Sequence, residues 1–267
     1  MSTAHSGSSD RRQQLQAAVK KRRGQLMPTP SQIVAEAQIS LKSTHSDILR
    51  NKQSISENLD QLIYELLNQE YELFKEHQQR VGVTMLSEYL QGAEWADSQD
   101  IRDHLDVQAY TVAAFSDIDQ IFLSFAQARR ARAGNSFERH LAYLLNLLEL
   151  PFQEQQVING KPDFLLPNAQ LYRDNPSDVV LISVKRTLRE RWRQIIIEGV
   201  KTSRYFLATI DENQSKDALD EMAQNRVFLV VPQAIIDTKP LYIAAKNVIS
   251  FNDLYRTFVV PASKRWS

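Results

Sequence analysis

Apolar positions recur at helical spacing through much of the first half of the chain. The clearest series lies between Ser56 and His77, and its members are three or four positions apart: Leu59, Leu62, Ile63, Leu66, Leu67 and Phe74. Such spacing predicts a helix with one buried face. A second series predicts a helix over 117–130. We therefore expect a helical N-terminal region over residues 31–131, preceded by a flexible basic arm over residues 1–30.

The pattern changes after Gly134, where short apolar runs alternate with helical stretches. A helix capped at Asn135 or Ser136 and stopped by Pro151 precedes five predicted strands, at 153–158, 162–166, 179–184, 205–210 and 227–231. Asn159-Gly160 predicts a hairpin turn between the first two strands. Further helices are expected at about 188–203 and at 216–224. This order predicts an α/β fold over residues 132–267, with a mixed central sheet flanked by helices.

Composition and charge narrow the class of protein. The chain is 43% hydrophobic and 24% charged, as ordinary globular proteins are. It has no cysteine, which excludes disulfides and thiolate metal sites and fits a reducing cytoplasm. No apolar run is long enough to span a membrane, so we expect no membrane partner. The formal net charge is zero, but the stretch KRTLRERWR from Lys185 to Arg193 is strongly basic, which indicates a localised anionic partner.

Two residues of this half suggest a chemistry. Asp163 begins one predicted strand and Lys185 ends the next, so both can lie at one sheet edge a few ångströms apart. Phosphodiester hydrolysis uses such a pair: a carboxylate holds Mg²⁺ against the phosphate, and a lysine positions the attacking water and offsets charge. One carboxylate holds a hard cation weakly, and two more are near in sequence: Glu138 on the preceding helix and Glu198 on the following one.

Each of these residues also has a purely structural interpretation. Asp163 can complete a turn, and Lys185 can extend to water from a strand end. Glu138 stands where a capping-box glutamate belongs, and Glu198 can pair with a basic residue on its own helix. Taken singly, each is better explained in this way. Their coincidence with the arginine cluster favours a nuclease site.

The segments RARAGNSFERHL, GKPDFLLP and SVKRTLRERWRQIIIEG carry a family resemblance. Over residues 129–231 the chain resembles the EcoRII, PspGI, SsoII and NgoMIV restriction endonucleases, a branch of the PD-(D/E)XK nuclease superfamily. In that group the acidic residue two before the lysine is replaced by a glutamate on the next helix. Here Ser183 holds the first position and Glu198 the second. The resemblance implies Asp163 and Glu198 as metal ligands, Lys185 as catalytic lysine and Glu138 as an accessory acid.

The resemblance also implies how DNA is read. The group recognises C/G pairs through an Arg-acid-Arg motif, which corresponds here to Arg189, Glu190 and Arg191. An arginine fork matches the O6 and N7 acceptors of guanine, and a carboxylate can accept from the N4 amine of cytosine. Arginines are also disfavoured near a helix N-terminus unless an anion is present. We expect Arg186 and Arg193 to contact phosphates at most.

These features together predict a type II restriction endonuclease from a prokaryotic cytoplasm. It would require Mg²⁺, act as a homodimer on double-stranded DNA, and cut a short palindromic site of the CCNGG, CCWGG or CCGG kind. Two alternatives remain open from the sequence. One is a structure-selective repair nuclease of the same superfamily, and the other is a DNA-binding regulator without catalysis.

Relatives with five-base sites can flip the central nucleotides out of the duplex. An extruded base needs an apolar or aromatic surface to receive it. The helical region offers four candidates for that surface: Tyr64, Tyr71, Phe74 and Trp95. The alternative for each is a core or joint position. Our hypothesis is that the N-terminal helical region supplies the pocket for the extruded base.

Overall fold

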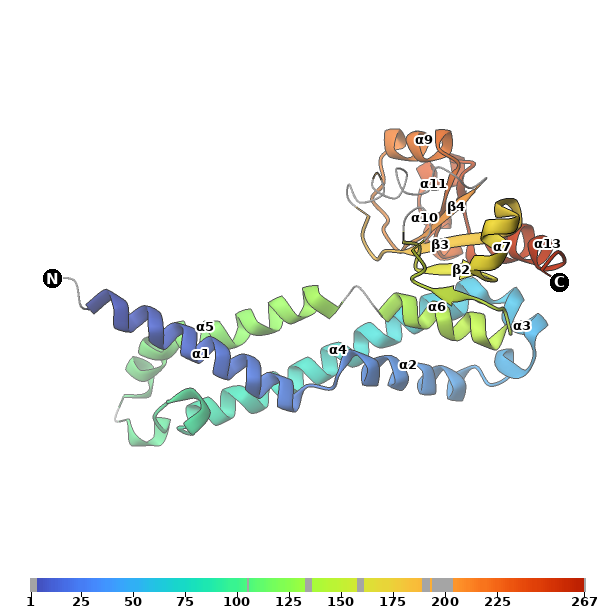
Figure 1. Ribbon diagram of the computed structural model, residues 1–267. Helices are drawn as coiled ribbons and strands as arrows, with labels where there is room; N and C mark the ends of the chain where they lie inside the picture. The colour runs from blue at the N-terminus through green and yellow to red at the C-terminus, as the bar shows by residue number, and fades with distance from the viewer. Residues whose placement is uncertain are drawn as a thin grey trace. The chain divides into compact units, whose positions relative to one another are not determined.

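The computed structural model describes residues 4–104, 106–132, 136–157, 161–188, 193 and 204–266 (Figure 1). The chain divides into two compact units. The first comprises residues 1–37 and 69–133, and the second comprises 38–68 and 134–267. Helices α2 (Pro30–Thr44) and α4 (Leu59–Leu90) contribute residues to both units. The segment 38–68, which we expected within the helical region, thus belongs to the unit that contains the sheet.

The second unit is built on one six-stranded mixed sheet, whose strands follow one another in chain order. The strands are β1 (Gln153–Glu154), β2 (Phe164–Leu166), β3 (Val180–Val184), β4 (Tyr205–Ala208), β5 (Val227–Val230) and β6 (Val248–Ile249). The first three pair antiparallel and the last four parallel. The mixed sheet flanked by helices is the one predicted. The strands are mostly shorter than expected, and β6 was not predicted.

Helices cover both faces of this sheet. They are α3 (Lys52–Glu57), α6 (Ser136–Leu147), α7 (Ala169–Asp174), α9 (Lys216–Gln224), α10 (Gln233–Thr238), α11 (Pro240–Ala244), α12 (Phe251–Asp253) and α13 (Val260–Ser263). Single turns of 3₁₀-helix lie at Ile48–Arg50, Glu94–Ala96, Ile101–Asp103 and Pro176–Asp178, and Leu254–Val259 is π-helical.

Strand β3 shows why two apolar cores form. Its five residues are all buried, as its continuous apolar run predicts. Val180, Ile182 and Val184 join a first core with α6 and the start of α4, while Leu181 joins a second core with α9, α10 and α11. Accordingly, α6 lies on one side of the sheet and α9 to α11 on the other (Figure 1).

The first unit is helical and has its own core. Helices α1 (Ala4–Leu26) and α5 (Val107–Arg132) pack together with the C-terminal part of α4. The expectation of a flexible arm over residues 1–30 is therefore wrong, since α1 occupies most of it. Leu15 and Val19, four positions apart, are buried in this core, and Arg22 pairs with Glu88 of α4. Among the described residues, no helix has both the length and the apolar character that crossing a membrane requires.

Asp60, in the first turn of α4, connects three segments of the second unit. Its carboxylate is buried and accepts the backbone N–H of Gln233 at 3.3 Å, of Phe251 at 2.7 Å and of Asn252 at 3.1 Å. Gln233 begins α10 and Phe251 begins α12, where N–H groups have no acceptor within the helix. One carboxylate thus caps two helices.

We expect Asp60→Asn to lower the free energy of unfolding by about 1–3 kcal/mol, because an amide has one acceptor oxygen for three backbone donors. Burial raises the pKa of Asp60 above its unfolded value. The folded state therefore binds this proton more tightly, so the wild type should gain stability relative to Asp60→Asn as the pH falls through the raised pKa. Urea denaturation at several pH values measures both effects. The exposed Asp47→Asn is the control, and equal midpoints for the two variants would contradict the prediction.

Candidate active site

Asp163 and Lys185 are in direct contact at one edge of the sheet. Lys185 Nζ donates to Asp163 Oδ2 at 3.0 Å, and the backbone N–H of Val184 donates to the same oxygen at 2.7 Å. Asp163 is nearly buried, with 11% of its side chain exposed, and Lys185 is partly exposed at 32%. The ammonium therefore reaches solvent while the carboxylate is fixed by the protein.

The antiparallel pairing of β2 with β3 explains this contact. Phe164 pairs with Ile182, so Asp163, one residue before β2, faces the residues at the end of β3. Asp163 O accepts the N–H of Gln155 at 3.1 Å, which also holds the residue to the strand on its other side. The distance of a few ångströms that the sequence suggested follows from this register.

Glu138, in the first turn of α6, lies in the electrostatic field of both residues. Burial raises the pKa of Glu138, the Asp163 carboxylate raises it further, and the Lys185 ammonium lowers it. A cation beside the Asp163 carboxylate would favour the charged form of Glu138. The arrangement therefore provides oxygen donors of the type that hard divalent cations prefer.

A small cavity of about 150 Å³ opens beside these carboxylates. It is lined by Glu138, Arg139, Glu154, Gln155, Asp163 and Phe164. Glu154 was not among the predicted residues. It lies on β1 directly opposite Phe164 and raises the pKa of Glu138. The sequence did contain a signal for Glu154. The hairpin predicted between the first two strands places Glu154 beside Asp163, the residue that precedes Phe164.

Ser183, two residues before Lys185, contributes no carboxylate. Its hydroxyl is 2.7 Å from the hydroxyl of Tyr205 on β4, and both residues are buried. Within the described ranges, no three His, Cys, Asp or Glu side chains form a group able to hold a metal ion. A complete ligand set would thus need a group from elsewhere.

The predicted residues beyond Lys185 are only partly described. Glu198, Arg189, Glu190 and Arg191 lie outside the described residues, as do the predicted Asn159-Gly160 turn and nearly all of the helix expected over 188–203. Arg186 donates to the carbonyl oxygen of Leu67 on α4 at 3.5 Å. Arg193 Nε lies 3.7 Å from a carboxylate oxygen of Glu221 on α9, with both side chains well exposed.

The four aromatic candidates for a base pocket differ in their surroundings. Phe74 is buried, with 4% of its surface exposed, and belongs to the protein interior. The indole N–H of Trp95 donates to Glu88 at 2.9 Å. Tyr64 and Tyr71 are 39% and 50% exposed, and the Lys75 ammonium lies over the Tyr71 ring, 5.1 Å from its centroid.

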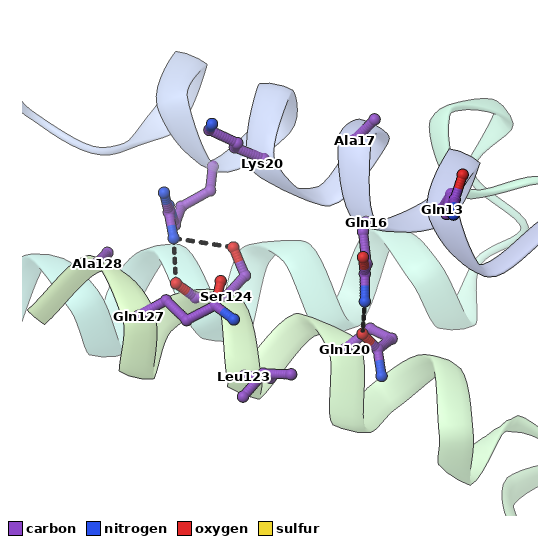
Figure 2. Close-up of a pocket in the computed structure, with 10 residues that line it drawn as sticks. Gln13, Gln16, Ala17, Lys20, Gln120, Leu123, Ser124, Gln127 and Ala128 are labelled. Atoms are coloured by element: carbon purple, nitrogen blue, oxygen red, sulfur yellow. Dashed lines mark hydrogen bonds between the residues drawn. The ribbon is translucent and has the colours of Figure 1, made fainter. Parts of the chain in front are cut away.

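A larger cavity, of about 470 Å³, lies between α1 and α5 in the first unit. Its lining is rich in amides: Gln13, Gln16, Ala17, Lys20, Arg23, Gln120, Leu123, Ser124, Gln127 and Ala128. Figure 2 shows Gln16 and Gln120 directed at each other from the two helices, and their side chains are hydrogen-bonded at 2.8 Å. Arg23 donates to Ser124 Oγ at 2.8 Å. No carboxylate is among these lining residues, so the cavity lacks the donors found beside Asp163.

The six-stranded mixed sheet with its flanking helices is the fold of the PD-(D/E)XK nucleases. The chain belongs to the family described as EcoRII C terminal, whose model matches residues 99–255. The resemblance stated from the sequence is confirmed by this match.

Three similar proteins are informative. The type II restriction enzyme EcoRII of Escherichia coli is 35% identical over 141 residues, which cover 49% of this chain and 35% of that enzyme. The type II restriction enzyme SsoII of Shigella sonnei is 28% identical over 183 residues, 63% of this chain and 58% of that enzyme. The chain thus matches less than two thirds of either relative. Metal-depleted Ecl18kI in complex with uncleaved DNA shares the fold, with a TM-score of 0.78 and 24% identity over 95% of this chain and 85% of that one.

Proposed function

We propose that this chain is a type II restriction endonuclease that hydrolyses both strands of DNA at a short palindromic C/G-rich site. The observation that carries the proposal is the contact between Lys185 and Asp163 beside Glu138, in a chain of the EcoRII C-terminal family. Both relatives matched in sequence are named type II restriction enzymes, and Ecl18kI is seen bound to DNA.

The described residues have distinct tasks in this proposal. Both recorded bonds to the Asp163 carboxylate use Oδ2, so we assign Oδ1 to a cation. Lys185, beside that carboxylate, can donate to the reacting phosphate and offset the negative charge that grows in the transition state. Glu138, whose pKa burial raises, is suited to hold or accept a proton near the reacting water.

The donors present fit Mg²⁺. Asp163 supplies a carboxylate oxygen, Glu138 lies near it as an accessory acid, and we assign a further ligand to Glu198 on the strength of the family resemblance. When bound, Mg²⁺ supplies Lewis-acid polarisation of the scissile phosphate and lowers the pKa of water nearby. Ecl18kI is described as metal-depleted in its complex with uncleaved DNA, which supports a metal requirement in this group.

A double-strand break needs two such centres. Among the described residues of one chain, Asp163 and Lys185 form a single pair that could serve one cleavage centre. A palindromic site presents the same sequence on both strands, so a two-fold homodimer places one centre on each. We therefore include a homodimer and a CCNGG-, CCWGG- or CCGG-like site in the proposal.

Incubation of the purified protein with plasmid DNA and Mg²⁺ tests the function. Discrete fragments are expected, and run-off sequencing of one digest identifies both the site and the stagger. Cleavage that follows DNA structure and ignores sequence would indicate a repair nuclease. A protein that binds the plasmid and never cuts it would contradict catalysis.

Replacing Arg189 or Arg191 with alanine should weaken binding to the cognate duplex more than binding to a random duplex. A lost bidentate base contact removes about 1–3 kcal/mol of discrimination, whereas a lost phosphate contact lowers all affinities together. Titration of both duplexes at one fixed salt concentration measures the difference. An equal decrease on the two would assign these arginines to the DNA backbone.

If the central nucleotide of the site is extruded, 2-aminopurine placed there should become strongly fluorescent when the protein binds with Ca²⁺. Extrusion costs a few kcal/mol of stacking and pairing, which an exposed aromatic ring can offset. Tyr64→Ala and Tyr71→Ala report whether either exposed ring receives the base, and Phe74→Leu is the buried control. An unchanged signal on a duplex shown to be bound would mean that the central pair stays stacked.

A further inference from the structure

The carboxylate of Asp211, in the loop that follows β4, holds the backbone of Leu188. The N–H of Leu188 donates to Asp211 Oδ2 at 2.8 Å. Asp211 Oδ1 accepts the N–H of Asn213 at 3.0 Å, a local turn that orients the carboxylate. Both carboxylate oxygens are therefore engaged, one within the loop and one with the segment that follows Lys185.

The backbone of Asp211 is itself fixed from two sides. The hydroxyl of Tyr242, on α11, donates to the Asp211 carbonyl at 2.7 Å and accepts the N–H of Gln214 at 3.3 Å. The N–H of Asp211 donates to Thr209 Oγ1 at 3.0 Å. Burial, together with the charges of Asp211 and Glu212, raises the pKa of Tyr242 to about 12, so its hydroxyl remains a donor. The carboxylate thus projects from a rigid support.

Strand β4 and the loop that follows it fix the two ends of the segment from Lys185 to Leu188. At the first end, the N–H of Lys185 donates to the carbonyl of Ala208 at 2.9 Å. At the second, the Leu188 side chain is fully buried in the second core while its N–H is held by Asp211. Leu188 is followed directly by Arg189. The backbone between the cleavage centre and the arginines therefore has a defined length and direction.

We propose that Asp211 is a positioning residue for sequence reading, because it holds Leu188, the residue directly before Arg189 in the sequence, in place relative to Lys185. This inference rests on the proposed function. The sequence predicts a helix that starts near Leu188, and the first N–H groups of a helix have no acceptor within it. A carboxylate there satisfies one such donor and is favoured by the helix dipole. A displacement of about 1 Å at such a support can cost on the order of 10²-fold in rate.

The test compares Asp211→Asn with Asp220→Asn, a matched change on the exposed face of α9. Asparagine has one acceptor oxygen and cannot hold the N–H of both Leu188 and Asn213. The ratio of kcat/KM on the cognate duplex to kcat/KM on a duplex with one altered base pair should fall about tenfold in Asp211→Asn. Affinity for a random duplex should match that of Asp220→Asn at a temperature at which both variants are folded. A residue that only stabilises the fold would change the unfolding temperature and leave the ratio alone.

Tyr242→Phe provides an independent variant, since it removes the hydroxyl that holds the Asp211 backbone and leaves the carboxylate in place. It should lower the same ratio, and it carries the test if Asp211→Asn does not fold. A wild-type ratio in the folded variants, with discrete cleavage by the wild type, would overturn this inference and leave the proposed function standing. Absence of discrete cleavage by the wild type itself would instead overturn the proposed function.

Discussion

The Lys185→Ala protein should bind the cognate duplex in Ca²⁺ about as well as the wild type and cleave it in Mg²⁺ at least about 10³-fold more slowly. The reason is that Lys185 acts on the phosphate and not on the bases. Asp163→Asn should have the same phenotype. It removes the charge that a cation needs and keeps one acceptor for the buried N–H of Val184, which an alanine would leave unsatisfied.

Single-turnover cleavage, with a binding titration on the same duplex, measures this effect. Lys216→Ala, at the exposed start of α9, is the control and should cleave at the wild-type rate. Wild-type turnover by Lys185→Ala would remove the lysine from the mechanism. Loss of binding together with cleavage would mean that these residues hold the fold or the DNA, and that the chemistry lies elsewhere.

Glu198→Ala should likewise lose cleavage by about 10³-fold and retain specific binding, because the proposal makes it the displaced metal ligand. Glu154→Gln is the informative comparison, since Glu154 lines the cavity beside Asp163 but was not among the family's residues. We expect Glu154→Gln to cleave within about tenfold of the wild type.

The same single-turnover assay over a range of Mg²⁺ concentrations separates the two glutamates. A variant that lacks a ligand should need more Mg²⁺ as well as react more slowly. The opposite result, with Glu154→Gln inactive and Glu198→Ala normal, would make Glu154 on β1 the metal ligand. The role that the family resemblance implies for Glu198 would then be wrong.

The pattern of apolar residues within a short segment was sufficient to predict β3 and α9. The strand Val180–Val184 is buried on both faces, so the apolar composition of this run alone identified β3. The spacing around Lys216–Gln224 identified α9 with its observed bounds. Strand β6 has only two residues, and it owes its place to pairing with β5. Such pairing is a tertiary effect that a two-residue pattern does not show.

Helix α1 and the carboxylate of Glu154 were missed for related reasons. Among the α1 residues whose burial is described, only Leu15 and Val19 are buried in the core, and two apolar positions give a weak periodic signal. Glu154 lies on an edge strand where its side chain is exposed. Its relation to Glu138 appears only once the hairpin and α6 are placed together. Sequence reasoning therefore finds residues that belong to a known motif more readily than residues such as Glu154, whose relevance depends on where the fold places them.

The interleaving of the two units limits how this chain can be divided. Leu62, Ile63 and Leu66, which precede most of the helical unit in the chain, are fully buried in the first core of the sheet unit. A fragment beginning at residue 132 would expose that core and lose Asp60, the common cap of α10 and α12. Recombination between related enzymes therefore cannot exchange the helical unit by a single crossover. It needs two, one on each side of 69–133, together with a compatible α1. The helical and sheet parts of this chain should consequently be inherited as one block.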